Sequence, residues 1–230
     1  MNPIKAICFD LDDTFWDLLS VIGHAEQTIY DWFAANYPKV TQQYSIAALR
    51  RLRVEVAHEF PGYHHDLMFL RLQCYRRVAE TAGYDADMSA EAFEVFQQAR
   101  NQVTLFTDVL PALKVLSTDF RLFTLSNGNA DLQVIGLDRW FEASFCAAEI
   151  GCAKPQPDIY RAVCEASGLA PEEIVHVGDD PHNDVHGPAA IGMPAVWLNR
   201  GERIWPEDLG QPLAEISDLG ELRGMLEPHA

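Results

Sequence analysis

Two aspartates separated by a single residue follow the first apolar run of the chain. The stretch reads ICFDLDDTFWD, in which Asp10 and Asp12 come directly after a short apolar segment. A spacing of two along an extended segment places both side chains on the same side. Two carboxylates about 4 Å apart repel each other by roughly 4 kcal/mol at an effective dielectric constant of about 20. A fold that gathers them has to supply a cation or a proton, which indicates metal or acid–base chemistry.

Three further polar clusters follow apolar runs later in the chain. The tripeptide SNG at residues 126–128 follows FRLFTL, KP at residues 154–155 follows AAEIGCA, and GDDPHND at residues 178–184 follows EIVHV. Each cluster taken alone is typical of a turn or a solvated loop. Ligands of parallel α/β sheets bind beyond the carboxyl ends of the strands. Four polar clusters at four strand ends therefore favour one shared site.

Such a site needs a parallel sheet, and the pattern of the chain predicts one. After about Leu105, short apolar runs alternate with helical patterns, which is typical of a parallel sheet with helices on both faces. Between about Leu18 and Gln102, apolar residues recur at spacings of three and four. This spacing predicts amphipathic helices in four segments: HAEQTIYDWFAANY, SIAALRRLRVEVAHEF, DLMFLRLQCYRRVAETAGY and SAEAFEVFQQARNQV.

Together these patterns predict an α/β fold, a Rossmann-like parallel sheet with an all-helical cap domain inserted after the first strand. We expect residues 1–16 and 106–230 to form the core and residues 17–105 to form the cap. Ser45 and Ser89 are the expected N-caps of two cap helices, because a serine hydroxyl accepts from free backbone N–H groups.

Composition and charge narrow the function classes. The chain has 230 residues and a formal net charge of -17, which argues against non-specific binding to nucleic acid or to anionic membranes. Its five cysteines form no CxxC pair, so we interpret them as reduced thiols in a cytoplasmic protein. No stretch is long and apolar enough to predict a membrane span. Oligomeric state stays open at this level.

The ordered set DLDDT, SNG, KP and GDDxxxD resembles the haloacid dehalogenase (HAD) superfamily of hydrolases. More narrowly, it resembles the phosphatase-like members that carry a helical cap after the first motif. The resemblance covers essentially the whole chain. SNGNADL and GLDRWFEASFCAAEIGCAKPQPDIY are also similar to segments of bacterial small-metabolite phosphatases, including flavin mononucleotide (FMN) phosphatase-like proteins. The resemblance implies hydrolysis of a small phosphorylated metabolite, with FMN, a sugar phosphate or a nucleotide as candidates.

The resemblance also implies a role for each motif. Asp10 would attack phosphorus and form an aspartyl-phosphate. Asp12 would protonate the leaving oxygen and then deprotonate the water that hydrolyses the intermediate. Ser126 and the backbone around Asn127 would donate hydrogen bonds to phosphoryl oxygens. Lys154 would balance charge on the nucleophile and the phosphate.

A magnesium ion is the cofactor that the resemblance implies. Mg²⁺ prefers oxygen ligands, and here they would be the Asp10 carboxylate, the Asp12 backbone carbonyl and Asp179. Asp184 would lie near the metal waters or hold the lysine of the third motif. The residues alone do not separate Asp180 from Asp179 and Asp184, although the family spacing GDxxxxD favours the latter two.

Several residues near the first motif and in the insertion have two interpretations. Thr14 could orient the nucleophile loop or be an ordinary strand-end threonine. Phe15 and Trp16 could pack in the hinge or stack on an aromatic substrate, and we favour packing. The histidines of residues 64–66 and His182 are interpreted as parts of surface loops. The insertion itself is expected to close over the site, exclude water and select the leaving group.

Three alternatives to a phosphatase use the same residues differently. A haloacid dehalogenase attacks carbon with the same aspartate and needs neither a second aspartate as acid nor a metal, whereas Asp12, Asp179 and Asp184 together favour phosphate. A phosphomutase shares all four motifs, so only an assay separates it. A non-catalytic interaction protein is disfavoured, because the chain retains every charged group that turnover requires and unpaired buried charges cost stability.

Overall fold

The computed structural model describes residues 3–201 and 203–226, and the chain divides into two compact units. The first, which we call the sheet unit, comprises Met1–Asp17, Thr104–Gly128 and Gly136–Ala230. The second, which we call the helical unit, comprises Leu18–Val103 and Asn129–Ile135. The chain thus leaves the sheet unit directly after the first polar motif.

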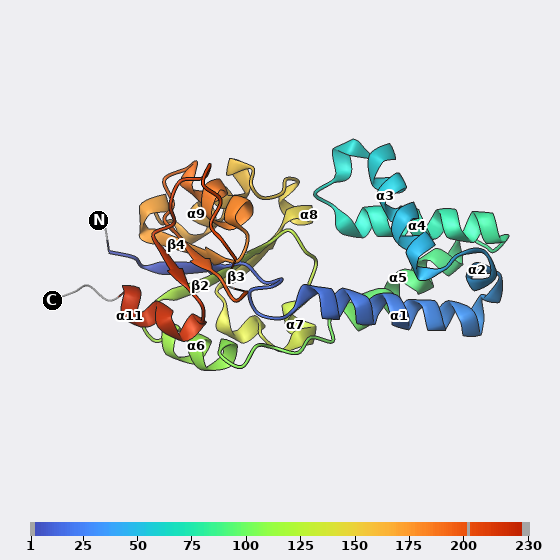
Figure 1. Ribbon diagram of the computed structural model, residues 1–230, viewed down its shortest axis with the longest axis horizontal. Helices are drawn as coiled ribbons and strands as arrows, with labels where there is room; N and C mark the ends of the chain where they lie inside the picture. Colours follow the sequence, from blue (N-terminus) through green and yellow to red (C-terminus); the bar gives the residue numbers. More distant parts are fainter. Residues whose placement is uncertain (1–2, 202, 227–230) are drawn as a thin grey trace. The chain divides into compact units, whose positions relative to one another are not determined.

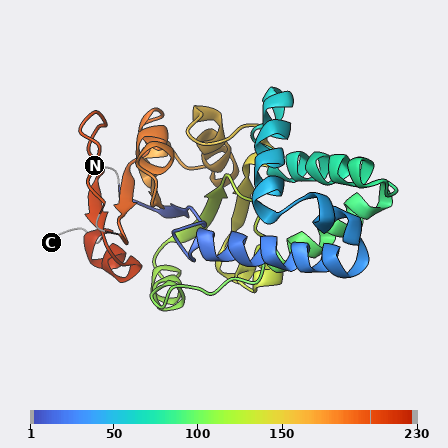
Figure 2. The same ribbon diagram turned by 45° about the vertical axis from the view of Figure 1, so that its right-hand side comes forward.

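The sheet unit is built on six parallel strands (Figure 1 and Figure 2). In chain order the strands are β1 (Ala6–Phe9), β2 (Arg121–Ser126), β3 (Ala143–Cys146), β4 (Ile174–Gly178), β5 (Ala195–Leu198) and β6 (Ala214–Ile216). They lie in the order β3-β2-β1-β4-β5-β6, and every neighbouring pair is parallel. β1 and β4 are buried along their whole length, as their continuous apolar sequences predict. The predicted α/β fold with a parallel sheet is therefore confirmed.

Helices cover both faces of this sheet. Figure 1 places α6 (Val109–Leu116) on one side and α9 (Pro157–Ser167) on the other. Alternate residues of β1 and β2 pack with α9 in one apolar core, formed among others by Ala6, Cys8, Phe123, Leu125, Ile159, Tyr160 and Val163. Three short helices complete the unit: α8 (Ala147–Ile150), α10 (Gly187–Ala189) and α11 (Leu222–Leu226).

One predicted strand is shorter than its sequence suggests. The apolar run AAEIGCA before the KP motif is expected to be a strand, but β3 ends at Cys146 and α8 follows at once. Gly151 ends that turn with φ +84°, a left-handed conformation that glycine adopts without steric cost. This turn precedes the Lys154 motif directly.

The helical unit contains the predicted amphipathic helices. The four predicted segments form α1 (Leu18–Asn36), α3 (Ile46–Glu59), α4 (Leu67–Ala82) and α5 (Asp87–Arg100). Two short helices that were not predicted, α2 (Pro38–Gln43) and α7 (Leu132–Ile135), also belong to this unit. Their apolar faces enclose a separate core, which includes Ile29, Phe33, Val56, Tyr75, Val78 and Phe96. None of the helices among the described residues is long and apolar enough to cross a membrane.

The two predicted N-caps of this unit have different outcomes. Ser45 precedes α3 and accepts a hydrogen bond from the Ala48 N–H at 3.2 Å, as expected. The prediction for Ser89 is wrong, because α5 begins at Asp87 and Ser89 lies buried in its first turn. Met88 is 1% exposed, and burying it requires the helix to start earlier than the serine suggests. The Ser89 hydroxyl donates instead to the Ala86 carbonyl.

Candidate active site

Strand register brings the polar motifs to one edge of the sheet. Phe9 at the end of β1 is aligned with Thr124 of β2 and with Val177 of β4. Asp10 continues this alignment, since its N–H donates to the Val177 carbonyl at 2.8 Å. Because parallel strands end on the same edge, the first, second and fourth motifs leave the sheet side by side.

Lys154 joins two of these motifs in a buried network, which we call the Lys154 cluster (Lys154, Asp10, Asp184 and His176). The Lys154 Nζ donates to Asp10 Oδ1 at 2.6 Å and to Asp184 Oδ1 at 2.7 Å. The three side chains are 2%, 9% and 1% exposed. His176 Nε2 lies 3.0 Å from the same Asp184 oxygen, and the Asp180 N–H donates to the other at 3.0 Å. Such short, charge-assisted contacts fix the position of Asp10.

Burial and neighbouring charges set the protonation of this cluster. Burial lowers the pKa of Lys154, but the Asp10 and Asp184 carboxylates outweigh it and raise that pKa well above the usual value. Burial opposes ionisation of Asp184 too, yet Lys154 and His176 hold its pKa below its usual range. Burial raises the pKa of Asp10 well above its usual value, because Lys154 offsets the cost of burying the charged carboxylate only in part. A second cation beside Asp10 would therefore favour its ionised, nucleophilic form.

The backbone of the third motif is fixed by the second. The Asn127 side chain donates from Nδ2 to the Lys154 carbonyl at 3.1 Å and accepts from the Lys154 N–H at 2.8 Å. Ser126 is buried, and its Oγ accepts from the Gly128 N–H at 2.9 Å. The Asn127 amide thus holds Lys154 in register with Asp10.

The fourth motif depends on a glycine and a capping aspartate. A Cβ on Gly178 would lie only 2.3 Å from Cγ of Asp184, so glycine is required for Asp184 to reach under the strand. Asp180 precedes the helical turn Pro181–His186, and its Oδ1 accepts from the N–H groups of His182 and Asn183 at 3.0 and 2.7 Å. Asp180 therefore serves as a cap, and its carboxylate is not part of the acidic group that converges near Asp10.

A set of carboxylates suited to a cation lies at this edge. Ligand oxygens of Asp10, Asp179 and Asp184 all lie within 4.8 Å of one another. Burial and repulsion from Asp184 raise the pKa of Asp179 to about 6, although Arg203 opposes this with an ion pair at 3.0 Å. Hard oxygen donors of this kind suit Mg²⁺. Both oxygens of Asp184 already have close partners, Lys154 and His176 on Oδ1 and the Asp180 N–H on Oδ2. Asp10 Oδ2 has only the 3.4 Å contact with Thr14, so Asp10 and Asp179 are the carboxylates more open to a cation.

The loop after Asp10 positions the second aspartate of the first motif. Asp12 Oδ1 accepts from Trp16 Nε1 at 2.8 Å, and Asp13 takes up a left-handed φ of +60°. Thr14 is fully buried, with Oγ1 3.4 Å from Asp10 Oδ2, a long hydrogen bond. The indole of Trp16 therefore orients the Asp12 carboxylate, while the threonine contacts the Asp10 carboxylate.

Comparison with known proteins identifies the family to which the chain belongs. A family model of haloacid dehalogenase-like hydrolases matches residues 4–192, a range that contains all four motifs. The chain belongs to this family. The sequence-based resemblance to HAD hydrolases is thereby confirmed.

Two of the most similar relatives and one solved structure extend this result. The 5-amino-6-(5-phospho-D-ribitylamino)uracil phosphatase YigB of Escherichia coli K12 is 33% identical over 238 residues, which cover 98% of each chain. The phosphoserine phosphatase of Thermus thermophilus is 34% identical over 159 residues, 66% of this chain and 63% of that one. A crystal structure described as 2-haloacid dehalogenase from Pseudomonas syringae pv. Tomato DC3000 is 36% identical, with a TM-score of 0.91 and coverage of 97% and 98%.

The aromatic residues after the first motif pack inside the HAD fold. Phe15 and Trp16 are both 0% exposed, and the Phe15 ring stacks on Phe141 with centroids 6.1 Å apart. This is the hinge-packing interpretation, so stacking of these rings on a substrate is not supported. His64 is exposed in a turn, as expected for a loop residue. His182 is exposed too, but it lies in the helical turn Pro181–His186 and not in a loop.

Three residues that sequence reasoning did not single out take part in this HAD site. His176 is a fully buried histidine against Asp184, and a polar residue inside the apolar run EIVHV was the available signal. Trp197 Nε1 donates to the Asp179 carbonyl at 2.8 Å. Arg203 pairs with the Asp179 carboxylate from the segment after β5, and nothing in its sequence context indicates that contact.

Proposed function

We propose that this HAD hydrolase is a Mg²⁺-dependent phosphatase that acts on a small phosphorylated metabolite through an aspartyl-phosphate on Asp10. The observation that carries the proposal is the position of Asp10 at a strand end, held by Lys154, with Asp12 two residues further on. One carboxylate is thus available to attack and a separate one to transfer protons.

The side chains divide the reaction into two steps. Asp10 attacks phosphorus and the bond between phosphorus and the ester oxygen breaks, while Asp12 gives its proton to the leaving alcohol. Asp12 then takes a proton from water, which attacks phosphorus, releases inorganic phosphate and restores the Asp10 carboxylate. Ser126 and the backbone around Asn127 bind phosphoryl oxygens, and Lys154 offsets negative charge on both reactants. Thr14 and Trp16 position the two aspartates.

Mg²⁺ would be held by the Asp10 carboxylate, the Asp12 carbonyl and Asp179. When bound, it offsets the repulsion between the phosphate dianion and the carboxylate of Asp10. Asp184 stays paired with Lys154 and so keeps the lysine in place. Arg203 contributes by holding the Asp179 carboxylate from its other side.

The names of the relatives support the substrate class. The E. coli relative is named for a substrate with a phosphorylated ribityl chain on a uracil ring, and the Thermus relative for phosphoserine. FMN also carries a phosphorylated ribityl chain, here on a flavin ring. We therefore place phosphorylated ribityl compounds first in a substrate panel, followed by sugar phosphates and nucleotides. The helical unit is proposed to act as the cap that selects among them.

A second candidate function is hydrolytic dehalogenation, which the Pseudomonas structure supports by its description. In that reaction Asp10 would displace halide from carbon. Halide needs no proton on leaving, and attack on a neutral carbon needs no metal. Asp12 and Asp179 would then have no part in the chemistry, so the phosphatase explains more of the site.

The deciding experiment compares the two reactions in one preparation. We expect p-nitrophenyl phosphate to be hydrolysed with Mg²⁺ and not after treatment with EDTA, while L-2-chloropropionate releases no chloride. Asp10→Asn should be inactive and Asp180→Asn active, since asparagine caps a helical turn as well as aspartate does. Full hydrolysis of p-nitrophenyl phosphate without metal contradicts the proposal. Release of chloride from L-2-chloropropionate by the wild type and not by Asp10→Asn also contradicts it. Conversion of a sugar phosphate into its isomer without phosphate release would indicate a mutase.

A further inference from the structure

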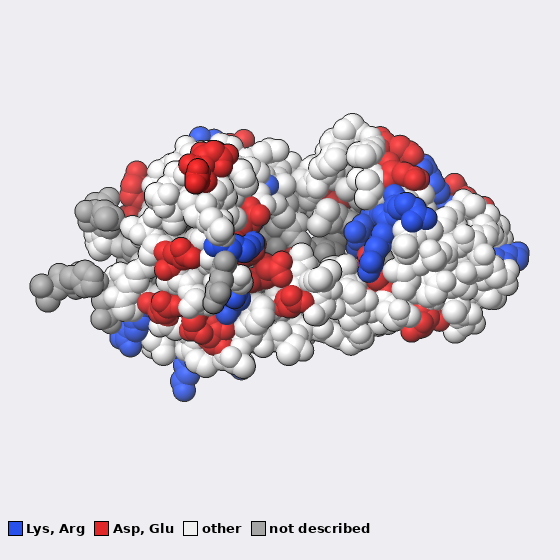
Figure 3. Space-filling view, in the orientation of Figure 1, with Lys and Arg blue, Asp and Glu red and all other residues white. Residues whose placement is uncertain are grey.

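A pocket in the helical unit contains more positive than negative charge. It is lined from α1 by Glu26, from α3 by Arg50 and Arg53, and from α4 by Arg71 and Tyr75. We call it the arginine pocket. Its charged lining residues are three guanidinium groups and one carboxylate, although the whole chain carries a formal net charge of -17. Figure 3 shows basic side chains gathered over this unit.

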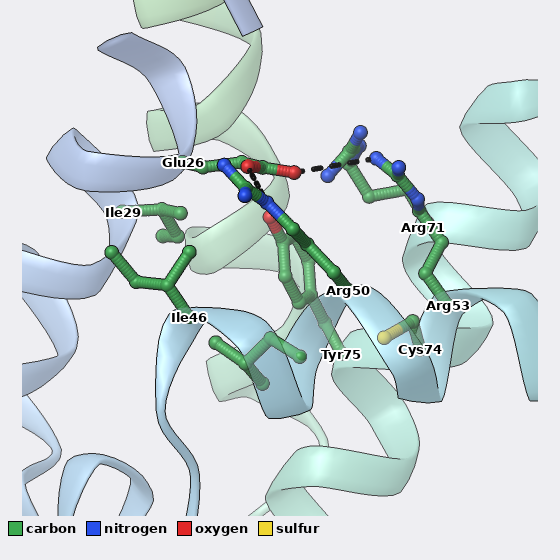
Figure 4. A pocket seen from close by; sticks show the side chains of 9 residues that line it. Glu26, Ile29, Ile46, Arg50, Arg53, Arg71, Cys74 and Tyr75 are labelled. Carbon is green, nitrogen blue, oxygen red and sulfur yellow. Dashed lines mark hydrogen bonds and ion pairs between the residues drawn. The ribbon is translucent and has the colours of Figure 1, made fainter. Parts of the chain in front are cut away.

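One carboxylate already occupies part of the arginine pocket. Glu26 is 8% exposed and accepts from Arg50 Nε at 2.6 Å, and its other oxygen lies 3.5 Å from Arg53 Nη1. Figure 4 shows these guanidinium groups and that of Arg71 converging around the Glu26 carboxylate. The pocket thus pairs guanidinium with carboxylate but leaves donors in excess.

Arg71 has no acidic partner among the described residues. Its guanidinium lies over the Phe96 ring, 3.4 Å from the centroid, which holds the group in place without neutralising it. Arg53 is affected by this excess of charge, since burial and repulsion from Arg71 lower its pKa in spite of Glu26. Glu26 pairs with Arg50 and more distantly with Arg53, so a second anion would stabilise the neighbouring guanidiniums of Arg53 and Arg71.

Tyr75 supplies an independent sign of a missing ligand. Its side chain is 4% exposed, and Arg71 lies close enough to interact with the hydroxyl oxygen, but the hydroxyl proton has no acceptor at hydrogen-bond distance among the described residues. Burial raises the pKa of this phenol to about 12, although nearby Arg71 opposes the shift, so the hydroxyl keeps its proton and is a donor. Buried hydroxyls are normally paired. In Figure 4 the Tyr75 hydroxyl points from the floor of the pocket toward the charged groups.

We propose that the arginine pocket binds a carboxylate group of a small molecule between Arg53, Arg71 and Tyr75. The pocket is partly open and its volume is about 30 Å³, which suits one small planar group of a ligand whose remainder extends outside the pocket. A planar carboxylate can accept from the forked guanidiniums and from the phenol together. Glu26 shows that this pocket already binds the same chemical group.

The test uses malonate as the probe and calorimetry on the intact protein. We expect malonate to bind the wild type, and Arg71→Met and Arg53→Met to raise its Kd by at least ~10-fold, the effect of losing a charge-assisted hydrogen bond. Tyr75→Phe should raise Kd about 2- to 10-fold with no loss of thermal stability. Arg76→Met is the matched control, because Arg76 is exposed on the same helix, and should bind malonate like the wild type.

Binding of malonate is expected to be independent of phosphatase activity. Asp10→Asn should bind malonate unchanged, so a failed phosphatase assay would not affect this test. No binding to the wild type, equal Kd values for Arg71→Met and Arg76→Met, or an unchanged Kd in Tyr75→Phe would each overturn the proposal.

The carboxylate has two sources that kinetics can separate. If it belongs to the substrate, Arg71→Met should raise KM for O-phosphoserine and leave KM for p-nitrophenyl phosphate unchanged. If it belongs to a separate effector, malonate should alter wild-type turnover of p-nitrophenyl phosphate, and Arg71→Met should abolish that effect. Both results require a carboxylate in the arginine pocket.

Discussion

The Lys154 cluster and the arginine pocket both combine positive and negative side chains, but the first has more carboxylates than cations and the second has more cations than carboxylates. In the first, one ammonium meets the carboxylates of Asp10 and Asp184 at 2.6 and 2.7 Å. In the second, one carboxylate meets two guanidiniums, while the guanidinium of Arg71 lies against an aromatic ring. The sheet unit thus has carboxylates in excess at its strand ends, whereas the arginine pocket of the helical unit has cations in excess.

The two imbalances of charge differ in how deeply the charged side chains are buried. Lys154 is 2% exposed, so its charge cannot be removed without leaving buried carboxylates unpaired. Arg50 is 54% exposed, and water screens much of the repulsion in its pocket. The difference teaches that the Lys154 cluster belongs to the folded core and suits a cation, whereas the arginine pocket tolerates its charge and suits an anion.

The largest expected effect is on activity at the nucleophile. Asp10→Asn keeps the shape of the side chain but removes the attacking carboxylate, and we expect kcat for p-nitrophenyl phosphate to fall by ~10⁴-fold or more. Steady-state kinetics with Asp180→Asn as the matched control measures this. A loss of similar size in the control would show that the acidic loop, rather than Asp10, is what the reaction requires.

The next effect is on stability and tests whether the Lys154 cluster supports the fold. Lys154→Met leaves Asp10 and Asp184 buried without a cation, so the free energy of unfolding should fall by about 3–5 kcal/mol. Lys114→Met, an exposed lysine of α6, should change it by less than about 0.5 kcal/mol. Urea denaturation measures both. Equal stabilities of the two variants would mean that the network does not support the fold.

Packing around the fourth motif predicts a smaller loss. Gly178→Ala places a methyl group against Asp184, where it would lie 2.3 Å from Cγ, and we expect a cost of about 1–3 kcal/mol together with reduced activity. Gly23→Ala in α1 has no atom within 4 Å of the added methyl and should stabilise by about 0.5–1 kcal/mol. Thermal denaturation gives the melting temperature of each variant for comparison with the wild type. The account is contradicted if both substitutions shift the melting temperature the same way.

The smallest effect is expected in the arginine pocket. Arg71→Met removes a guanidinium that has no ion pair among the described residues and relieves its repulsion of Arg53. The free energy of unfolding should therefore change by no more than about 0.5 kcal/mol. A loss near that of Lys154→Met, measured under the same conditions, would mean that the positive excess is structural and not available for a ligand.

The convergence of the motifs of Asp10 and Asp184 follows from sequence because of topology. Both motifs come after buried strands, and parallel strands bring their carboxyl ends to one edge. Lys154 lies beyond α8 instead, and the Asn127 side chain holds its backbone. The amphipathic spacing of Leu18 to Gln102 likewise predicts helices, since apolar residues at intervals of three and four form one face. Where the helices begin is less certain from sequence, as Ser89 shows, because burial of Met88 decides the start of α5.

Contacts that depend on loop paths and packing could not be predicted. Arg203 reaches Asp179 only through the course of the segment after β5. The capping role of Asp180 depends on the helical turn that follows it, and an acidic run does not indicate which carboxylate turns back to the chain. Arg53 and Arg71 come from different helices, so their proximity follows from the packing of α3 against α4.

The most direct test of the central claim is to trap the covalent intermediate. Wild-type protein mixed with Mg²⁺ and excess p-nitrophenyl phosphate is quenched in acid within milliseconds, and its peptides are sequenced by mass spectrometry. We expect one phosphoryl group on Asp10 in the wild type and none in Asp10→Asn. Turnover without any phosphoryl group on Asp10, or its attachment to Asp12 or Asp13 instead, would contradict it.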